Sequence, residues 1–267
     1  MPSSSAAQAI VSIRSAEFRV GERVIWRELD LEVMPGEFIA ILGANGAGKT
    51  TLLRAILGER GLSSGRIELP GGREGIGYVP QHYAAAEGAP IRAGDLVGLA
   101  VDGAHFGLPW PSRARRERVA ALLAEVDASA LARIPVARLS GGQQQRIRIG
   151  QALAADPTLL LCDEPFGSLD PHQEQIVAEL IDRRRREHNT AVLLVTHDLS
   201  PVLGMVDRVL YLAGGTFRIG TVDEVMRTEV LSELYGAPVQ VVRLGDQLAV
   251  IGASQSAHEH GREHHHG

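Results

Sequence analysis

The stretch GANGAGKTT, residues 43 to 51, constrains the fold of this chain more than any other feature. It fits the pattern G-x-x-x-x-G-K-[ST] in full, follows the apolar run FIAIL and overlaps the start of the periodic segment TTLLRAILG. A continuous apolar run is typical of a buried parallel strand, and the periodic segment has helical spacing and stops at a glycine. The sequence therefore predicts a strand, a glycine-rich loop and a helix in succession.

Each part of this loop suits a bound phosphate chain. Glycines let the backbone curl around phosphates without side-chain clashes, and the loop amides and the helix N-terminus point at the anion. We expect Lys49 to reach the outer phosphates and the Thr50 hydroxyl to bind magnesium. The alternative is an ordinary glycine-rich turn, which the strand–loop–helix context disfavours. The residues expected to contact the nucleotide are Gly43, Asn45, Gly46, Ala47, Gly48, Lys49, Thr50 and Thr51.

Two carboxylates end a second apolar strand, predicted in LLLCDEP, residues 159 to 165. Asp163, at the carboxyl end of the strand, is placed to join the magnesium shell. Glu164 is expected to point elsewhere, because strand side chains alternate, and to orient or deprotonate the water that attacks the γ-phosphate. Alone, such a strand end is weak evidence, because an ordinary helix or loop start is the alternative, and beside a phosphate-binding loop it becomes strong evidence for this magnesium and water chemistry.

Strands and helices alternate along the chain, which predicts an α/β fold with a mainly parallel sheet. Residues 83 to 113 are rich in Ala, Gly and Pro and give no clear pattern. The predicted strands lie in VSIRSAEFRV, VIWRELDLEV, EFIAILG, GRIELPGG, GIGYVP, TLLLCDEP and AVLLVTHD, and the predicted helices in TTLLRAILG, SRARRERVAALLAEVDA, QQQRIRIGQALAAD and PHQEQIVAELIDRRRREH.

Composition and charge bound the class of protein. The 267 residues suffice for one large domain or a domain with a subdomain. A formal net charge of -5 gives no reason to expect a nucleic-acid partner. The only cysteine, Cys162, can form no internal disulfide and is expected to pack as a small apolar residue, which fits a reducing compartment. The run RRRR, residues 183 to 186, indicates a solvated helix end.

The sequence gives no sign of a secretory signal, and no apolar run approaches the roughly 18 residues that cross a bilayer. If the protein works at a membrane, we expect another chain to supply the membrane-spanning part.

LSGGQQQR, residues 139 to 146, resembles the signature motif of ABC ATPases. Three further stretches resemble motifs of that family: Gln81 in GYVPQ its Q-loop, Ser168, Leu169 and Asp170 its D-loop, and His197 in VTHD its switch histidine. All stand in the family's order across residues 10 to 215. A single SGG is most often only a helix-capping turn, so it is the ordered set that carries the resemblance.

The resemblance implies a P-loop ABC ATPase cassette: a RecA-like core, a small antiparallel β subdomain and an inserted α-helical subdomain. We expect the cassette at residues 1 to 230, its helical subdomain at about 83 to 157, a C-terminal extension at 231 to 251 and a disordered His-rich tail at 252 to 267.

The resemblance also implies a head-to-tail pair of cassettes, in which the second cassette is another copy of this chain, giving a homodimer, or a homologue. Each ATP would lie between the P-loop of one chain and Ser140, Gly141, Gly142 and Asp170 of the other. His197 would contact the γ-phosphate and hold the water with Glu164, and Gln81 would contact magnesium and sense a membrane partner. One position departs from the family pattern: Val20 stands where an aromatic residue usually stacks on adenine, so either Val20 gives only apolar contact or Phe18 substitutes.

Finer similarity points to the zinc/manganese importer group. GIGYVPQHY, HFGLPWPSRARR and VLSELYGAPVQVV resemble that group, although manganese, heme and other chelate importers remain alternatives, as does a non-transport ABC switch protein. The implied partners are an integral membrane permease and, indirectly, an extracytoplasmic metal-binding protein. The chain itself would lie peripherally on the cytoplasmic face of the inner or plasma membrane.

The sequence ends in HEHGREHHHG. Interrupted histidines beside carboxylates suit zinc or another borderline metal, whereas manganese prefers oxygen ligands. A cytosolic zinc buffer or sensor is the hypothesis, and a low-complexity tail or a residue of cloning is the alternative. The candidate ligands are His258, His260, His264, His265 and His266.

Overall fold

A six-stranded sheet forms the centre of the computed structural model, which describes residues 8–81, 91–103, 112–245 and 247–252. Its strand order is β5-β6-β7-β3-β8-β9, with only the edge pair β8–β9 antiparallel. All residues of β6 and β7 are buried, as their unbroken apolar sequences predict. The bounds are β3 Phe38–Gly43, β5 Ile76–Val79, β6 Leu159–Asp163, β7 Ala191–Val195, β8 Arg208–Ala213 and β9 Thr216–Gly220.

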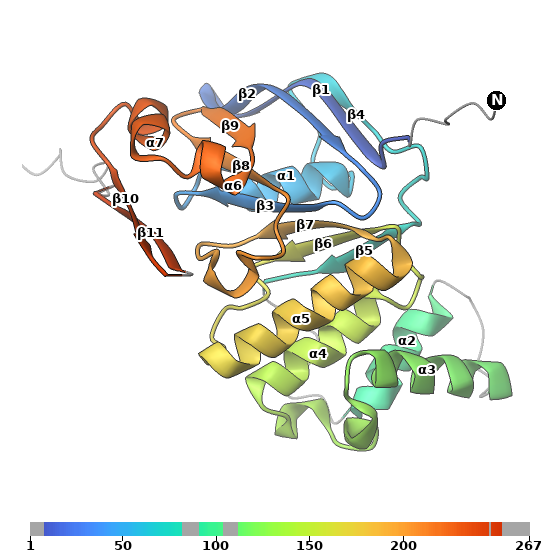
Figure 1. Cartoon of the computed structure of the whole chain (residues 1–267). Helices are drawn as coiled ribbons and strands as arrows, with labels where there is room; N and C mark the ends of the chain where they lie inside the picture. The colour runs from blue at the N-terminus through green and yellow to red at the C-terminus, as the bar shows by residue number, and fades with distance from the viewer. Residues whose placement is uncertain (1–7, 82–90, 104–111, 246, 253–267) are drawn as a thin grey trace, which may run out of the picture.

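A smaller antiparallel sheet lies over one face of the central sheet, with helix α1 (Lys49–Ile56) between the two (Figure 1). Leu52, Leu53 and Ile56 of α1 are fully buried in one apolar cluster with residues of both sheets. The strand order is β2-β1-β4, and the bounds are β1 Val11–Val20, β2 Arg23–Val33 and β4 Ser64–Glu68.

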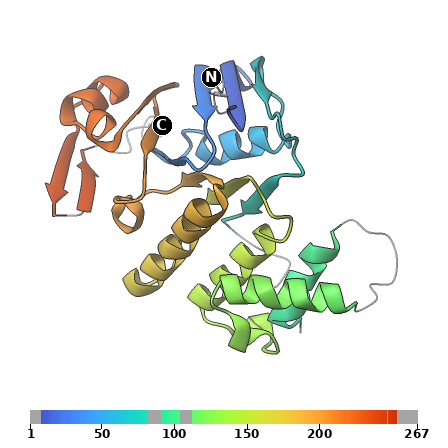
Figure 2. The same ribbon diagram turned by 45° about the vertical axis from the view of Figure 1, so that its right-hand side comes forward.

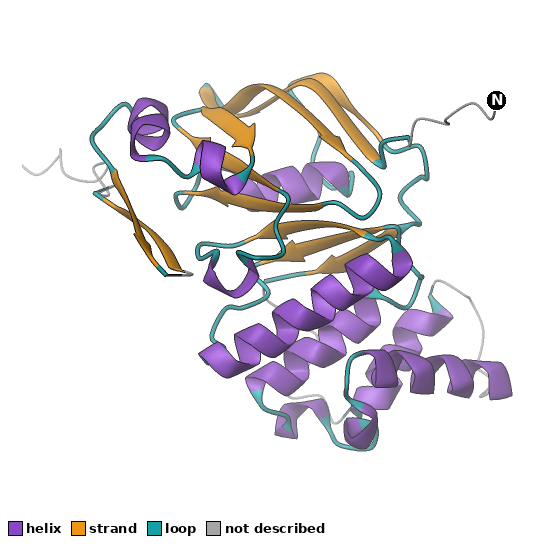
Figure 3. Cartoon of the chain, in the orientation of Figure 1, coloured by secondary structure: helices purple, strands orange, loops and turns teal. Residues whose placement is uncertain are grey.

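Helices α4 (Gly141–Ala152) and α5 (Pro171–His188) cover the opposite face of the central sheet and lie side by side (Figures 1 and 3). Helices α2 (Ala93–Asp102) and α3 (Arg113–Glu125) pack beyond α4, away from the sheet (Figure 2). We call α2, α3 and α4, with the turns η2 (Ser129–Leu131) and η3 (Val136–Arg138), the helical part.

The C-terminal region adds two short helices and a hairpin beside β8 and β9. Val241, Leu248 and Val250 on one face of the hairpin pack against the core, while Leu244 and Ile251 are exposed on the other. Among the described residues, no helix is long and apolar enough to cross a membrane. The bounds are η4 Ser200–Val202, α6 Val222–Val225, α7 Thr228–Tyr235, β10 Gln240–Leu244 and β11 Gln247–Ile251.

The predicted α/β class is confirmed. The range of α5 agrees with its prediction, and α2 lies inside the stretch that had no clear pattern. The expectation for the arginine run is wrong for Arg184, whose side chain is only 3% exposed because it is surrounded by acceptors from other segments. The expected His-rich tail lies outside the described residues.

Candidate phosphate-binding site

The glycine-rich loop joins the end of β3 to the start of α1, as its sequence predicts. Gly48, the N-cap residue of α1, has φ +89, a conformation that side chains disfavour. A Cβ there would lie 2.4 Å from Ile25 Cγ2 and 2.8 Å from Trp26 Nε1. A Cβ on Gly43 would lie 2.1 Å from the carbonyl oxygen of Leu212. Both positions therefore require glycine for two reasons, backbone angle and space.

Lys49 is almost buried, with its ammonium group turned onto the loop. Its Nζ donates to the carbonyl oxygens of Gly43 at 2.7 Å and Ala44 at 3.0 Å. Burial lowers the pKa of Lys49, whereas the nearby carboxylates of Glu164 and Asp163 act in the opposite direction. A cation held over a loop rich in backbone amides is suited to a polyanion.

Asp163 at the end of β6 meets Thr50 at the start of α1. The Thr50 hydroxyl donates to Asp163 Oδ1 at 3.0 Å, although 113 positions separate the two residues. Burial raises the pKa of Asp163, the hydrogen bond from Thr50 lowers it, and the charge of Glu164 raises it again. A hydroxyl and a carboxylate in contact are the hard oxygen donors that magnesium prefers, so the residues present fit this cation.

Glu164 leaves the strand with an unusual backbone. Its φ of +48 is left-handed, and its amide still donates to the carbonyl of Val195 in the neighbouring strand. Such a conformation costs about 1–2 kcal/mol for a residue with a Cβ. The turn separates the Glu164 side chain from that of the buried Asp163, and Oε2 of Glu164 accepts a hydrogen bond from Gln81 Nε2 at 2.7 Å.

His197 lies just beyond the carboxyl end of β7 and is exposed. It is close enough to Glu174 in the first turn of α5 to affect its pKa: burial and Asp198 raise that pKa, and His197 lowers it. In the described part of the chain, no hydrogen bond joins His197 to Glu164. The histidine therefore stands at the same edge of the sheet, facing α5.

The signature stretch forms the N-terminus of α4. Ser140 caps this helix: its hydroxyl accepts from the amide of Gln143, whose side chain accepts from the Ser140 amide in return. Gly142 packs so closely on α5 that a Cβ would lie 2.1 Å from Gln173 Oε1. Asp170 caps α5 by accepting from the amide of Gln173 at 2.9 Å. Both capping residues are exposed.

The structure thus brings one half of the expected residues together. Lys49, Thr50, Asp163, Glu164 and Gln81 are linked by hydrogen bonds or by charge at one edge of the sheet. Among described residues, no hydrogen bond or ion pair joins Ser140, Gly141 or Gly142 to that group. Asn45, Ala47 and Thr51 lie in or next to the loop. The five tail histidines are outside the described residues.

Sequence reasoning missed the residues beneath the loop. Ile25 and the fully buried Trp26 pack under Gly48, and Trp26 Nε1 has no hydrogen-bond partner among the described residues. Phe18 stacks on Trp26 with ring centroids 5.7 Å apart, while Val20 at the hairpin tip is 62% exposed. The alternation of β2 was the available signal, because it places Trp26 on the inner face.

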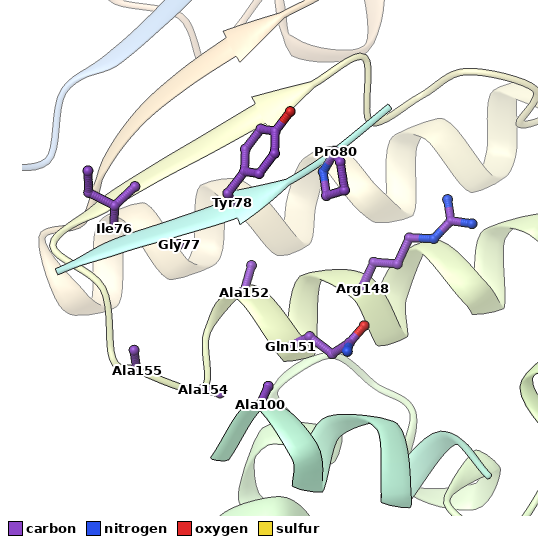
Figure 4. Close-up of a pocket in the computed structure, with 10 residues that line it drawn as sticks. All are labelled: Ile76, Gly77, Tyr78, Pro80, Ala100, Arg148, Gln151, Ala152, Ala154 and Ala155. Carbon is purple, nitrogen blue, oxygen red and sulfur yellow. The ribbon is translucent and has the colours of Figure 1, made fainter. Parts of the chain in front are cut away.

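A pocket of about 220 Å³ lies beside Pro80, the residue before Gln81 (Figure 4). It lies between strand β5 and the helical part, and Tyr78 and Pro80 line it on one side. Ala100 of α2, with Arg148 and Gln151 of α4, lines the other side. The pocket lining thus includes Pro80, which directly precedes Gln81 in the chain.

Residues 26–167 match the ABC transporter family. The chain is 38% identical over 223 residues to the zinc import ATP-binding protein ZnuC of Paracoccus denitrificans, covering 82% of each. It is also 37% identical over 215 residues to the aliphatic sulfonates import ATP-binding protein SsuB 1 of Pseudomonas fluorescens, covering 80% of this chain and 78% of that protein.

Two solved structures of ABC proteins are also similar to this chain. An inward-facing transporter described as of the metal-chelate ABC type has a TM-score of 0.78 and 26% identity, covering 91% of this chain and 96% of its own. A dimeric ATP-binding cassette bound to ADP and Pi has a TM-score of 0.68 and 26% identity, covering 79% and 98%. The chain belongs to the ABC transporter family, and it is an ATP-binding ABC transporter ATPase.

Proposed function

We propose that this chain is the ATPase subunit of an importer that energises uptake of a divalent metal, zinc first, through a separate membrane permease. The observation that supports ATP hydrolysis at this site is the pair of hydrogen bonds Thr50–Asp163 and Gln81–Glu164 beside the glycine-rich loop. They place an oxygen-donor pair for a cation next to a carboxylate that can act on water.

Each side chain has a proposed task in hydrolysis. Lys49 would release the carbonyls of Gly43 and Ala44 to bind the outer phosphates. Glu164 would accept a proton from the attacking water or orient it, and Gln81 fixes the carboxylate for that purpose. His197 would approach the γ-phosphate from β7.

Thr50 and Asp163 would hold magnesium, with Gln81 as a further ligand. When bound, the cation supplies charge neutralisation at the β- and γ-phosphates. The contact between Thr50 Oγ1 and Asp163 Oδ1 supports this assignment, because both oxygens are already side by side.

A second copy of the chain would complete the site. Ser140, Gly141 and Asp170 are exposed and Gly142 is buried, all at helix N-termini, and among the described residues no hydrogen bond or ion pair joins them to the loop of their own chain. Amides at such helix ends suit an anion supplied by another molecule. The proposed state is a head-to-tail homodimer with two ATP molecules between the chains.

The pocket lined by Pro80, one residue before Gln81, is the proposed contact between the nucleotide site and the permease, on the cytoplasmic face of the membrane. An extracytoplasmic metal-binding protein would deliver the cargo to that permease. In this proposal the cassette comprises residues 1 to 230, with its helical subdomain at about 83 to 157. Residues 231 to 251 form the extension and 252 to 267 the tail.

The identity of the transported substrate is the most specific part of the proposal. Sequence identity alone does not separate zinc importers from sulfonate importers, since relatives of both kinds are 37–38% identical to this chain. Metal is favoured by the metal-chelate type transporter among similar structures and by five histidines in the last ten residues. A manganese or heme importer, or a non-transport switch protein, are the competing functions.

Cellular metal content tests the cargo. Zinc, manganese and iron are measured in cells with and without the gene under metal limitation, and growth is scored on a sulfonate as the sole sulfur source. A selective zinc deficit is expected. A growth defect on the sulfonate with normal metal content would mean that the transported substrate is a sulfonate, and the assignment as an importer ATPase would stand. Co-purification with ribosomes or DNA would indicate a switch protein instead. Removing residues 253–267 should lower zinc affinity of the purified chain, and unchanged affinity would end the hypothesis of a zinc-binding tail.

A further inference from the structure

The arginine run at the end of α5 connects two parts of the molecule that hold separate halves of the site. Arg185 and Arg186 bond within the core: both pair with Asp182, and Arg185 also reaches the carbonyl of Gly36 and the carboxylate of Asp207. The other two arginines point to the helical part and to the loop that follows α4.

Arg184 is the most enclosed of the four. Its Nε donates to Thr190 Oγ1 at 3.1 Å, and its Nη1 to Glu125 Oε1 at 3.2 Å. Its Nη2 donates to Asp156 Oδ1 at 2.6 Å and to the carbonyl of Pro157 at 3.4 Å. A planar guanidinium fixes the directions of all these bonds at once, which a lysine cannot do. The end of α3, the loop after α4 and the end of α5 thus meet at one side chain.

Arg183 reinforces this junction at the end of α3. Its Nη2 donates to the carbonyl oxygen of Glu125 at 2.6 Å and to Asp127 Oδ2 at 3.1 Å. The last carbonyls of a helix have no partner inside the helix, so this bond caps α3. The carbonyl of Asp127 is also held by Arg146 of α4 at 2.9 Å.

The other end of α5 also touches the helical part. The helix begins after Asp170, in the segment that follows Glu164, and Gln173 in its first turn packs against Gly142. One helix therefore contacts the start of α4 near its N-terminus, through Gln173, and the end of α3 near its C-terminus, through Arg183 and Arg184. Two separated contacts restrain rotation of the helical part about α5 more than a single contact would.

We propose that Arg183 and Arg184 are positioning residues that lock the helical part onto α5 and so fix Ser140–Gly142 relative to Glu164. Neither arginine touches the nucleotide loop. This inference rests on the proposed head-to-tail site, in which the signature stretch of one chain must meet the ATP of the other. Displacements of about 1 Å can cost about 100-fold in rate, so a loose junction would affect turnover.

Turnover and ATP binding of Arg184→Met are compared with those of Arg186→Met, a matched control whose side chain is 67% exposed. For Arg184→Met we expect an unchanged Kd for ATP, because the loop is untouched, and kcat lower by about tenfold or more. Arg184→Lys should restore little, since it lacks the planar fork. The control should match the parent chain. A parent-like kcat in Arg184→Met, measured well below its Tm, would overturn the proposal.

A distance measurement separates positioning from mere stabilisation. Nitroxide labels on Arg27→Cys in β2 and Arg116→Cys in α3 report the core and the helical part, and both sites are exposed. Cys162 is fully buried and stays unlabelled. The distance distribution should be narrow in the parent and broad in Arg184→Met. A narrow distribution with only a lowered Tm would reduce Arg184 to a stabilising residue.

Arg183→Met, at a side chain that is 41% exposed, provides a second variant if Arg184→Met fails to fold. It should broaden the distances in the same direction, and a narrow distribution there would equally overturn the proposal. The label distances do not depend on catalysis. Normal hydrolysis in Glu164→Gln would therefore refute the proposed mechanism without affecting this test.

Discussion

Gln81 Nε2 donates a hydrogen bond to Glu164 Oε2 at 2.7 Å and so links the segment after β5 to the residue after β6. The bond holds a carboxylate whose own backbone is left-handed, at the point where the chain leaves the strand. A displacement of Pro80 in the neighbouring pocket would be passed to Gln81 and so to Glu164, the carboxylate proposed to act on water.

Glu164→Gln should bind ATP normally and hydrolyse it at least about 100-fold more slowly, because an amide cannot take a proton from water. The fold should be unchanged, since the amide oxygen can still accept from Gln81. Phosphate release and nucleotide binding are measured side by side, with Glu229→Gln on exposed α7 as the control. Turnover at the parent rate would remove Glu164 from its assigned role.

Asp163→Asn should raise the Tm of the nucleotide-free protein and abolish magnesium-dependent hydrolysis. Burial raises the pKa of Asp163, so ionising it costs the folded state stability at neutral pH. An isosteric amide removes the charge and keeps an acceptor for Thr50. Each kcal/mol gained corresponds to about 2–4 °C in a chain of this size.

The gain in Tm expected for Asp163→Asn depends on pH in a defined direction. A carboxyl with a raised folded pKa destabilises the fold above that pKa and is neutral in both states below its ordinary value of 3.8. The Tm difference between Asp163→Asn and the parent should therefore shrink as the pH falls towards 3.8. A difference that is constant with pH, or of opposite sign, would contradict this account.

Gly48→Ala should cost more stability than Gly46→Ala. Both residues have positive φ, +89 and +77, which costs an alanine about 1–2 kcal/mol. Only at Gly48 would the new Cβ also collide with Ile25 and Trp26, whereas at Gly46 nothing lies within 4 Å. Thermal unfolding of the two variants measures both losses of stability. Equal losses would mean that Ile25 and Trp26 shift to accommodate the new Cβ at little cost.

Val20→Tyr should tighten ATP binding several-fold, about the 0.5–1.5 kcal/mol of an aromatic pair. Val20 is exposed at the tip of the β1–β2 hairpin and has no aromatic ring, and the Phe18 ring packs against the buried Trp26. Val20→Leu is the aliphatic control. Titrations with ATP and GTP measure both affinity and selectivity for the base. If Val20→Tyr gains no affinity for ATP, the adenine base does not lie against residue 20.

Local sequence patterns predicted most of the elements near the site. The unbroken apolar runs of β3, β6 and β7 and the motif at Lys49 are local signals, and the structure has these elements at nearly the expected residues. The β8–β9 pair and the C-terminal hairpin were not predicted, because their pairing depends on the sheet edge available to them.

Contacts between distant positions were beyond sequence reasoning. Gln81 and Glu164 are 83 positions apart, and Arg184 and Glu125 are 59 apart. A run of arginines predicts solvent exposure unless acceptors from elsewhere surround it, and those acceptors become neighbours only after folding. The positive φ of Glu164 likewise has no local sequence signal, since glutamate does not favour it.

Trp26, one of two tryptophans in the chain, lies fully buried directly beneath Gly48, and within the described part of the chain its indole N–H has no partner. Indole emission depends on the polarity and motion of the surroundings. Any rearrangement of the glycine-rich loop around a phosphate chain would change the surroundings of the Trp26 ring. The protein therefore carries its own optical reporter, and nucleotide entry can be followed by fluorescence on the unlabelled chain.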